Sequence, residues 1–210
     1  MAIEIRRLKE TNYSYKDLVD LLHEAFQERL KQGLKYTCSS MTEEQFCQKT
    51  IDGIVYVAVD DESGLCGTAT LTIRTDKKGG RYGYNEYNGI RSDMKGKGIG
   101  TMLYREIERE SRENGCEYLL SDTSTLATSA VKYHLKNGFK IIGLESYRST
   151  NYWSYVFRRQ LVPSKKWNDP IYCKLQYLKS WLFIRVTRDI NGNDTMIGRL
   201  YKRMVGKEIV

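Results

Sequence analysis

The chain has 210 residues, enough for one domain with a sizeable core, and its 40% hydrophobic and 29% charged residues are typical of a globular protein. No apolar run is long enough to span a membrane and no apolar leader with a basic flank opens the chain, so we expect a cytoplasmic protein without a membrane span. The five scattered cysteines form neither a disulfide pattern nor a zinc motif, and of the net charge of +8, +6 comes from residues 162–210.

The apolar spacing along the chain predicts a mixed α/β fold. The expected strands cover residues 3–8, 54–59, 67–74, 82–90, 118–122, 139–144 and 152–161, and the expected helices cover residues 11–33, 41–50, 98–114 and 128–136. Thr42 and Gln45 fit a capping box at the start of the second of these helices. No internal repeat interrupts the order β-α-α-β-β-β-α-β-α-β-β.

The segment after Pro163 is expected to be a basic helical extension. A helix over residues 171–185 would carry an apolar face, and a short helix would follow residue 194. That face consists of Ile171, Leu175, Leu178 and Leu182, with Trp181 beside it. We expect it to be buried against the preceding domain or a second subunit, because a patch of this size invites association. The basic residues could meet nucleic acid, anionic lipid or an acidic partner, but a solvated surface is the simpler expectation.

Three glycines at every second position mark the stretch Lys95-Gly96-Lys97-Gly98-Ile99-Gly100. They open directly into a helix, whose first N–H groups lack intrahelical acceptors and favour an anion. The spacing fits neither a Walker loop nor the dinucleotide-binding fingerprint. It indicates a cradle for a diphosphate, with a plain strand-to-helix turn as the alternative.

Two motifs together resemble the GNAT N-acetyltransferase superfamily. The glycine stretch is similar to its pattern Gln/Arg-x-x-Gly-x-Gly/Ala, with Lys95 in first place, and Ala130 to Phe139 (AVKYHLKNGF) is similar to its motif Ala-Ile-x-x-Tyr-x-x-x-Gly-Phe. The resemblance covers about residues 3–161. It implies a GNAT domain over residues 1–161, with a mixed central sheet flanked by helices, and an extension over residues 162–210.

The resemblance also implies acetyl-CoA as co-substrate, with no metal. The diphosphate would be held by Lys95, Gly96, Lys97, Gly98, Ile99, Gly100 and Thr101. The pantetheine arm and the acetyl carbonyl would be held by the backbone near Gly89, Ile90 and Arg91, where the family's fourth strand parts from the fifth.

Candidate proton-transfer groups are few. Glu86 is the expected base, because simple alternation puts it on the strand face of Asn88 and Ile90, although a salt-bridged glutamate is the alternative. His134 occupies the place of the tyrosine that the resemblance assigns as proton donor, and the adjacent Tyr133 is the alternative donor. The asparagine that often contacts the cofactor is replaced here, by Ala127.

The resemblance places acceptor binding on the first helix pair and the last hairpin. The candidates there are Phe26, Arg29, Tyr36, Tyr152 and Trp153. Few carboxylates occur among them, so we expect a small-molecule primary amine that attacks acetyl-CoA directly in a ternary complex, and no nucleic acid. The alternatives are a macromolecular amine, on a protein or an aminoacylated RNA, and a non-catalytic acyl-CoA-binding module. A homodimer is compatible with the sequence.

Overall fold

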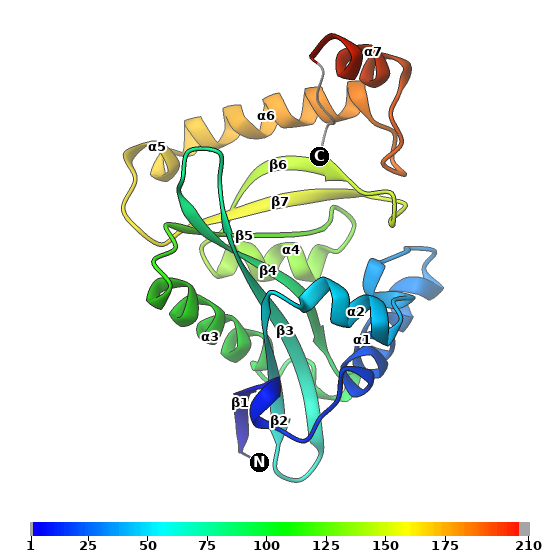
Figure 1. Cartoon of the computed structure of the whole chain (residues 1–210), viewed down its shortest axis with the longest axis vertical. Coiled ribbons are helices and arrows are strands. Elements are labelled where there is room, and N and C mark those ends of the chain that lie inside the picture. The colour runs from blue at the N-terminus through cyan, green and yellow to red at the C-terminus, as the bar shows by residue number, and fades with distance from the viewer. Residues whose placement is uncertain (1, 206–210) are drawn as a thin grey trace. The chain divides into compact units, whose positions relative to one another are not determined.

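A mixed sheet organises the first of two compact units, which runs to Ser121 in a computed structural model that describes residues 2–205 (Figure 1). Its strands are β1 (Ile3–Arg7), β2 (Gly53–Asp60), β3 (Gly64–Thr75), β4 (Arg81–Ile90) and β5 (Tyr118–Ser124), in that order across the sheet. Neighbouring strands are antiparallel except β4 and β5, which are parallel. The predicted α/β class is confirmed.

Helices lie on both faces of this sheet. They are α1 (Tyr15–Lys31), α2 (Glu43–Thr50) and α3 (Ile99–Glu113), with single turns η1 (Leu8–Glu10), η2 (Thr37–Ser39) and η3 (Ser92–Met94). Two glycines of β4 show the close packing on each side. A Cβ at Gly83 would lie 2.7 Å from Ser111 of α3, and one at Gly89 would lie 2.8 Å from Leu22 of α1.

The helix starts follow from side-chain caps. Ser14 and Asp17 form a capping box before α1, and Thr42 and Gln45 form the predicted one before α2. Helix α1 then packs on β4 and β3 and α2 packs on β2, and their apolar faces join in one cluster that includes Leu18, Leu22, Phe46 and Val57. Each such fully buried side chain stabilises the fold by about 2 kcal/mol.

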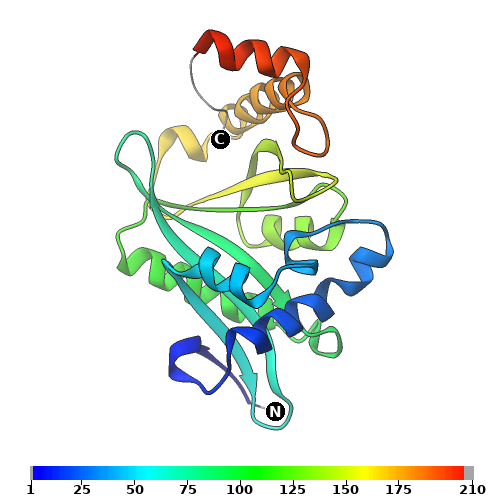
Figure 2. The same ribbon diagram turned by 45° about the vertical axis from the view of Figure 1, so that its right-hand side comes forward.

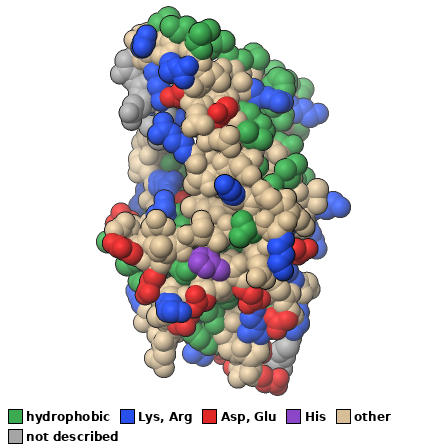
Figure 3. Space-filling view, turned by 90° about the vertical axis from the view of Figure 1, so that its right-hand side faces the viewer, with side chains coloured by type: hydrophobic (Ala, Val, Ile, Leu, Met, Phe, Trp, Pro, Cys, Tyr) green, Lys and Arg blue, Asp and Glu red, His purple; other side chains and the backbone are tan. Residues whose placement is uncertain are grey.

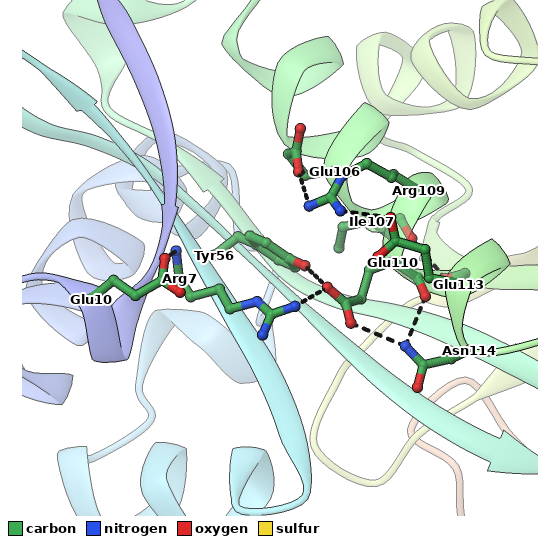
Figure 4. Close-up of polar contacts among 10 residues, drawn as sticks. Arg7, Glu10, Tyr56, Glu106, Ile107, Arg109, Glu110, Glu113 and Asn114 are labelled. Atoms are coloured by element: carbon green, nitrogen blue, oxygen red, sulfur yellow. Dashed lines mark hydrogen bonds and ion pairs between the residues drawn. The ribbon is translucent and has the colours of Figure 1, made fainter.

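Helix α3 is fixed to β1 and β2 by a polar network around Glu110 (Figure 4). Arg7 of β1 forms an ion pair with this carboxylate, the Tyr56 hydroxyl of β2 donates to it at 2.7 Å, and the Asn114 amide donates at 3.0 Å. Burial disfavours the charged form, but the hydrogen bonds from Tyr56 and Arg7 outweigh burial and lower the pKa of Glu110. The charged network therefore holds in place the helix that follows the glycines.

The second unit begins at Asp122, and up to residue 205 the structure describes a hairpin and four helices in it. They are α4 (Thr128–Lys136), β6 (Lys140–Ser146), β7 (Trp153–Gln160), α5 (Lys165–Asn168), α6 (Pro170–Thr187) and α7 (Met196–Val205). Strands β6 and β7 are antiparallel, and α6 lies along β6. The Ser180 hydroxyl joins them, because it donates to the Leu144 carbonyl at 3.0 Å and accepts from the Leu144 N–H at 2.9 Å.

The tail is helical as expected, but the apolar face predicted to be buried does not pack on the preceding domain, and its burial against a second subunit stays a prediction. Helix α6 contacts β6 through the side that carries Ser180, Cys173 and Ile184. The face predicted to be buried is exposed to solvent in this chain: the exposed fraction is 69% for Ile171 and 60% for Leu182. The sequence pattern missed this because apolar residues occur on both sides of α6. Among residues 2–205, no helix is both long and apolar enough to cross a membrane.

Candidate functional site

The glycine stretch forms an open turn before α3. Gly96 and Gly98 have left-handed φ angles of 81° and 83°, and a Cβ at either would meet no atom within 4 Å. Gly98 is the N-cap of α3, so no side chain caps this helix, and its first turn contains no acidic residue. The helix dipole therefore faces an open space that an anion can enter.

The other predicted residues of the cradle surround this turn. Lys95 and Lys97 are exposed, and the Lys97 ammonium lies 3.1 Å from the Met94 sulfur. Ile99 is buried beneath the turn, while the Thr101 N–H already donates to the Gly98 carbonyl at 2.9 Å. These residues are consecutive in the sequence, and their role in binding a diphosphate stays a prediction.

Strands β4 and β5 part beside this turn. Their parallel pairing extends from Tyr82 opposite Tyr118 to Asn85 opposite Ser121, and β4 continues to Ile90 paired with β3 alone in the described register. Hydrogen-bonded and non-hydrogen-bonded pairs alternate in an antiparallel ladder. The Arg91 N–H donates to the Cys66 carbonyl at 3.0 Å, so Ile90, one residue earlier, directs its N–H away from β3.

A β-bulge at Tyr87 reverses the alternation of side chains between the two faces of the sheet for the residues of β4 that follow it. Tyr87 has a positive φ of 51°, and the register jumps from Glu86 opposite Thr70 to Gly89 opposite Thr68. Glu86 therefore shares a face with Gly89, and Ile90 lies on the other face. The expectation that Glu86 shares a face with Ile90 is wrong, because it rested on uninterrupted alternation. Gly89 is a local signal that could have indicated the bulge, because a glycine inside a strand pattern often marks one.

Glu86 is held by two polar partners on its own face of the sheet. Its carboxylate forms an ion pair with Arg74 at 2.9 Å and accepts from the Thr72 hydroxyl at 3.2 Å. The Arg74 guanidinium also lies over the Tyr84 ring, 4.5 Å from its centre. The carboxylate is largely covered, with 19% of its side chain exposed. Arg74 and Thr72 were not singled out by the sequence, since they lie on a different strand.

The Arg91 side chain links the end of β4 to the start of β3. Its guanidinium pairs with Asp93 at 2.7 Å and donates to the carbonyls of Ser63 and Leu65 at 2.8 and 3.0 Å. With its N–H bonded to Cys66 as well, Arg91 fixes the start of the glycine turn to β3. Its contact with a cofactor stays a prediction.

Tyr133 and His134 lie on α4 in the second unit and differ in environment. His134 is 6% exposed, stacks on Phe157 with 4.5 Å between ring centres, and has its Nδ1 2.8 Å from the Ala130 carbonyl. Since a carbonyl only accepts, Nδ1 carries the hydrogen. Burial lowers the pKa of the His134 imidazole, and burial raises the pKa of the half-buried Tyr133 hydroxyl. A neutral imidazole and a protonated phenol result.

The predicted acceptor residues are distributed over both units. Phe26 of α1 packs on Tyr36 with ring centres 4.8 Å apart, and Arg29 follows one turn later on α1. In the second unit Tyr152 is buried, and Trp153 begins β7 with its ring 5.8 Å from the Arg185 guanidinium. Phe26 and Trp153 are half-buried and retain surface for a ligand, whereas Tyr36 and Tyr152 are mostly covered.

Comparisons with known proteins agree on one family. Residues 15–139, more than half of the chain, match the model of the acetyltransferase (GNAT) family. No curated protein matches the sequence. Among solved structures, an N-acetyltransferase from Staphylococcus aureus Mu50 is 22% identical, with a TM-score of 0.61, 78% of this chain covered and 100% of that chain.

Two further structures share the fold at lower identity. The PaiA N-acetyltransferase from Thermoplasma acidophilum in complex with coenzyme A is 19% identical, with a TM-score of 0.57 and coverage of 76% of this chain and 99% of that chain. The NatC complex bound to Gag peptide and CoA is 15% identical, with a TM-score of 0.58 and coverage of 77% and 100%. At these identities the likeness is one of fold.

Proposed function

The chain belongs to the GNAT acetyltransferase family, and we propose that this acyltransferase moves the acetyl group of acetyl-CoA to a primary amine of a small molecule, by direct attack in a ternary complex. When bound, acetyl-CoA supplies a thioester that an amine can attack. The observation that carries the proposal is the uncapped, acid-free start of α3 behind two left-handed glycines, next to the parting of β4 and β5. We place the activity in the cytoplasm, since scattered cysteines suit a reducing compartment.

The first unit supplies the contacts for the cofactor. The N–H groups from Lys95 to Gly100 bind the diphosphate with the help of the Lys95 and Lys97 charges, whereas the Thr101 N–H is already bonded to the Gly98 carbonyl. The Ile90 N–H, which points away from β3, donates to the acetyl carbonyl and stabilises the charge that develops on its oxygen. A preorganised backbone donor of this kind lowers the barrier by about 3 kcal/mol.

Two side chains move protons in the proposed reaction. Glu86 takes the proton that the amine loses, directly or through water, because Arg74 and Thr72 hold its carboxylate in place. Tyr133 gives a proton to the departing thiolate. The contacts favour Tyr133 over His134. In the neutral imidazole of His134 the single N–H, at Nδ1, is donated to the Ala130 carbonyl.

Tyr133→Phe should lower kcat by about 100-fold with little change in acetyl-CoA affinity, because it removes the proton donor and keeps the ring. His134→Phe, which preserves the stack on Phe157, should lower kcat much less. Since burial raises the pKa of Tyr133, its proton is present throughout the range below pH about 10, and kcat should not fall between pH about 6 and 9. Full turnover in Tyr133→Phe, with loss in His134→Phe, would assign the role to His134.

Glu86→Gln should lower turnover by about tenfold to 100-fold, because an amide cannot accept the amine proton. Raising the pH should restore part of the rate, since more of the amine is then already neutral. Glu4→Gln is the control, because it breaks an Arg–Glu ion pair on β1 that is more exposed than that of Glu86 and has no place in the proposed reaction. Equal rates for the two variants at every pH would remove Glu86 from the mechanism.

The acceptor is best identified by thiol release from acetyl-CoA against a panel of amines. Half-buried Phe26 and Trp153 offer aromatic surface for an amino sugar or an amino-acid-like molecule. A peptide amine is the second candidate, because the NatC neighbour is described as bound to a Gag peptide. Thiol release with amino sugars or free amino acids, and none with peptides or aminoacylated RNA, supports a small-molecule acceptor. The reverse pattern supports a macromolecular acceptor.

A further inference from the structure

Helix α6 carries apolar side chains on two opposite sides. Its inner side lies on β6 through Ser180 and the buried Ile184. At 100° per residue, a second row lies about half a turn away from Ser180. This outer row, between 38% and 69% exposed, consists of Ile171, Leu175, Leu178, Leu182 and Val186. A helix that is apolar on both sides normally has a partner on both sides.

Helix α7 packs against the C-terminal part of α6 (Figures 1 and 2). The Tyr201 ring packs edge-on against Phe183 with 5.2 Å between centres. Gly198 lies so close to α6 that a Cβ there would come within 2.1 Å of the Thr187 carbonyl oxygen. The side chains that α7 leaves between 49% and 78% exposed are Met196, Ile197, Leu200 and Met204.

Positive charge borders the outer row of α6 and the exposed apolar residues of α7. Residues 170–205 include seven Lys or Arg and only two acidic residues. Asp189 accepts two backbone N–H bonds within its own turn, and Asp194 pairs with Lys202 at 2.7 Å. Lys174, Lys179, Arg185, Arg199 and Arg203 are therefore the basic border of the surface. In Figure 3, green hydrophobic and blue Lys or Arg side chains gather at the top of the view, over these helices.

We propose that this docking face, formed by the outer row of α6, the exposed apolar residues of α7 and the basic border, binds the surface of an anionic lipid bilayer. Apolar residues flanked by Lys and Arg are the composition of helices that lie in the headgroup region. Trp181 stands at the border with the Arg185 guanidinium 5.1 Å from its ring, a pairing of an amphipathic ring and a cation that suits this depth.

The charge of the docking face distinguishes lipid from a second copy of the chain. Two copies joined through this face would bring their basic borders together, and like charges at close range oppose association. An anionic bilayer compensates the charge on both sides of the outer row at once. The apolar residues and the basic border then contribute to one binding event.

Flotation of the full-length protein with lipid vesicles tests the proposal. Vesicles with about 30% phosphatidylglycerol in phosphatidylcholine should carry at least about tenfold more protein than phosphatidylcholine alone, and added salt should weaken binding. Leu182→Glu should reduce flotation by about tenfold or more, since it places a charge in the apolar row. Ile51→Glu, at a still more exposed apolar residue of the first unit, should float like the wild type.

The basic border is tested separately. Lys174→Glu with Lys179→Glu should abolish the preference for anionic vesicles, whereas Lys16→Glu, at an exposed lysine of α1, should not. Thermal unfolding verifies the fold of each variant, and Met204→Glu, at 78% exposure, repeats the apolar test if Leu182→Glu does not fold.

Equal flotation with neutral and anionic vesicles would overturn the proposal. So would light scattering that shows a dimer which Leu182→Glu dissociates, with no vesicle binding by the wild type, because a second copy would then cover the docking face. Acetyl transfer takes no part in these measurements, so their outcome is independent of the proposed acceptor.

Discussion

Gly98→Asp is expected to lower the affinity for acetyl-CoA by about 100-fold or more, equal to roughly 3 kcal/mol. Gly98 is the N-cap of α3 and faces open space, so the new carboxylate would occupy and repel the position proposed for the diphosphate. The fold should persist, because aspartate tolerates a left-handed backbone better than most residues and an acid at a helix N-terminus is favourable. Isothermal calorimetry measures the affinity.

Gly115→Asp is the matched control for this change. Gly115 follows the other end of α3, has a similar left-handed φ of 70°, and a Cβ there would also meet nothing within 4 Å. Both variants therefore carry the same backbone strain and the same added charge. If they bind acetyl-CoA equally well, the start of α3 is not the diphosphate site.

Glu110→Ala should lower the free energy of unfolding by about 3 kcal/mol, or the melting temperature by roughly 5–10 °C. The change leaves the buried Tyr56 hydroxyl without its acceptor and removes the ion-pair partner of Arg7, which is partly exposed and can turn toward water. Urea unfolding measures the loss. Glu113→Ala, which breaks an exposed pair with Arg109 on the same helix, should cost under about 1 kcal/mol.

The Glu110 contribution should also depend on pH. Because the pKa of Glu110 is lowered in the folded protein, its stabilisation is complete above the unfolded value of about 4.3 and is lost as the pH falls through the folded pKa. The wild type and Glu110→Ala should therefore converge in stability below pH about 4. A constant difference down to pH about 2 would contradict a role for the carboxylate charge.

The regular elements were predictable because their signals are local. Capping boxes at Ser14 and Thr42 begin two helices, and left-handed glycines such as Gly138 follow helix ends. The glycine turn before α3 is local as well, and its open geometry agrees with the sequence pattern. Contacts between distant segments carried no such signal. The meeting of Arg7, Tyr56 and Glu110 depends on which strands pair, which no short pattern states.

The site was predictable only up to the first irregularity. Alternation placed Glu86 and Ile90 on one face, and a single extra residue at Tyr87 reversed that relation. The choice between Tyr133 and His134 likewise depended on burial and on the Ala130 carbonyl, which adjacent residue numbers cannot distinguish. In α6, apolar periodicity predicted burial of the side that carries Leu182, but the opposite apolar side, with Ile184, packs on β6.

The parting of β4 from β5 has a consequence for how the protein avoids aggregation. A row of outward N–H and C=O groups on a strand is a template for β-pairing with a foreign chain, and proteins commonly blunt such edges with bulges. The bulge at Tyr87 lies in the stretch of β4 that extends beyond its pairing with β5. It interrupts the straight ladder that an invading strand would need, while Ile90 still offers its N–H to a narrow ligand. If acetyl-CoA binds as proposed, the stretch that takes the pantetheine arm is thus also the stretch in which the bulge disfavours pairing with a foreign strand.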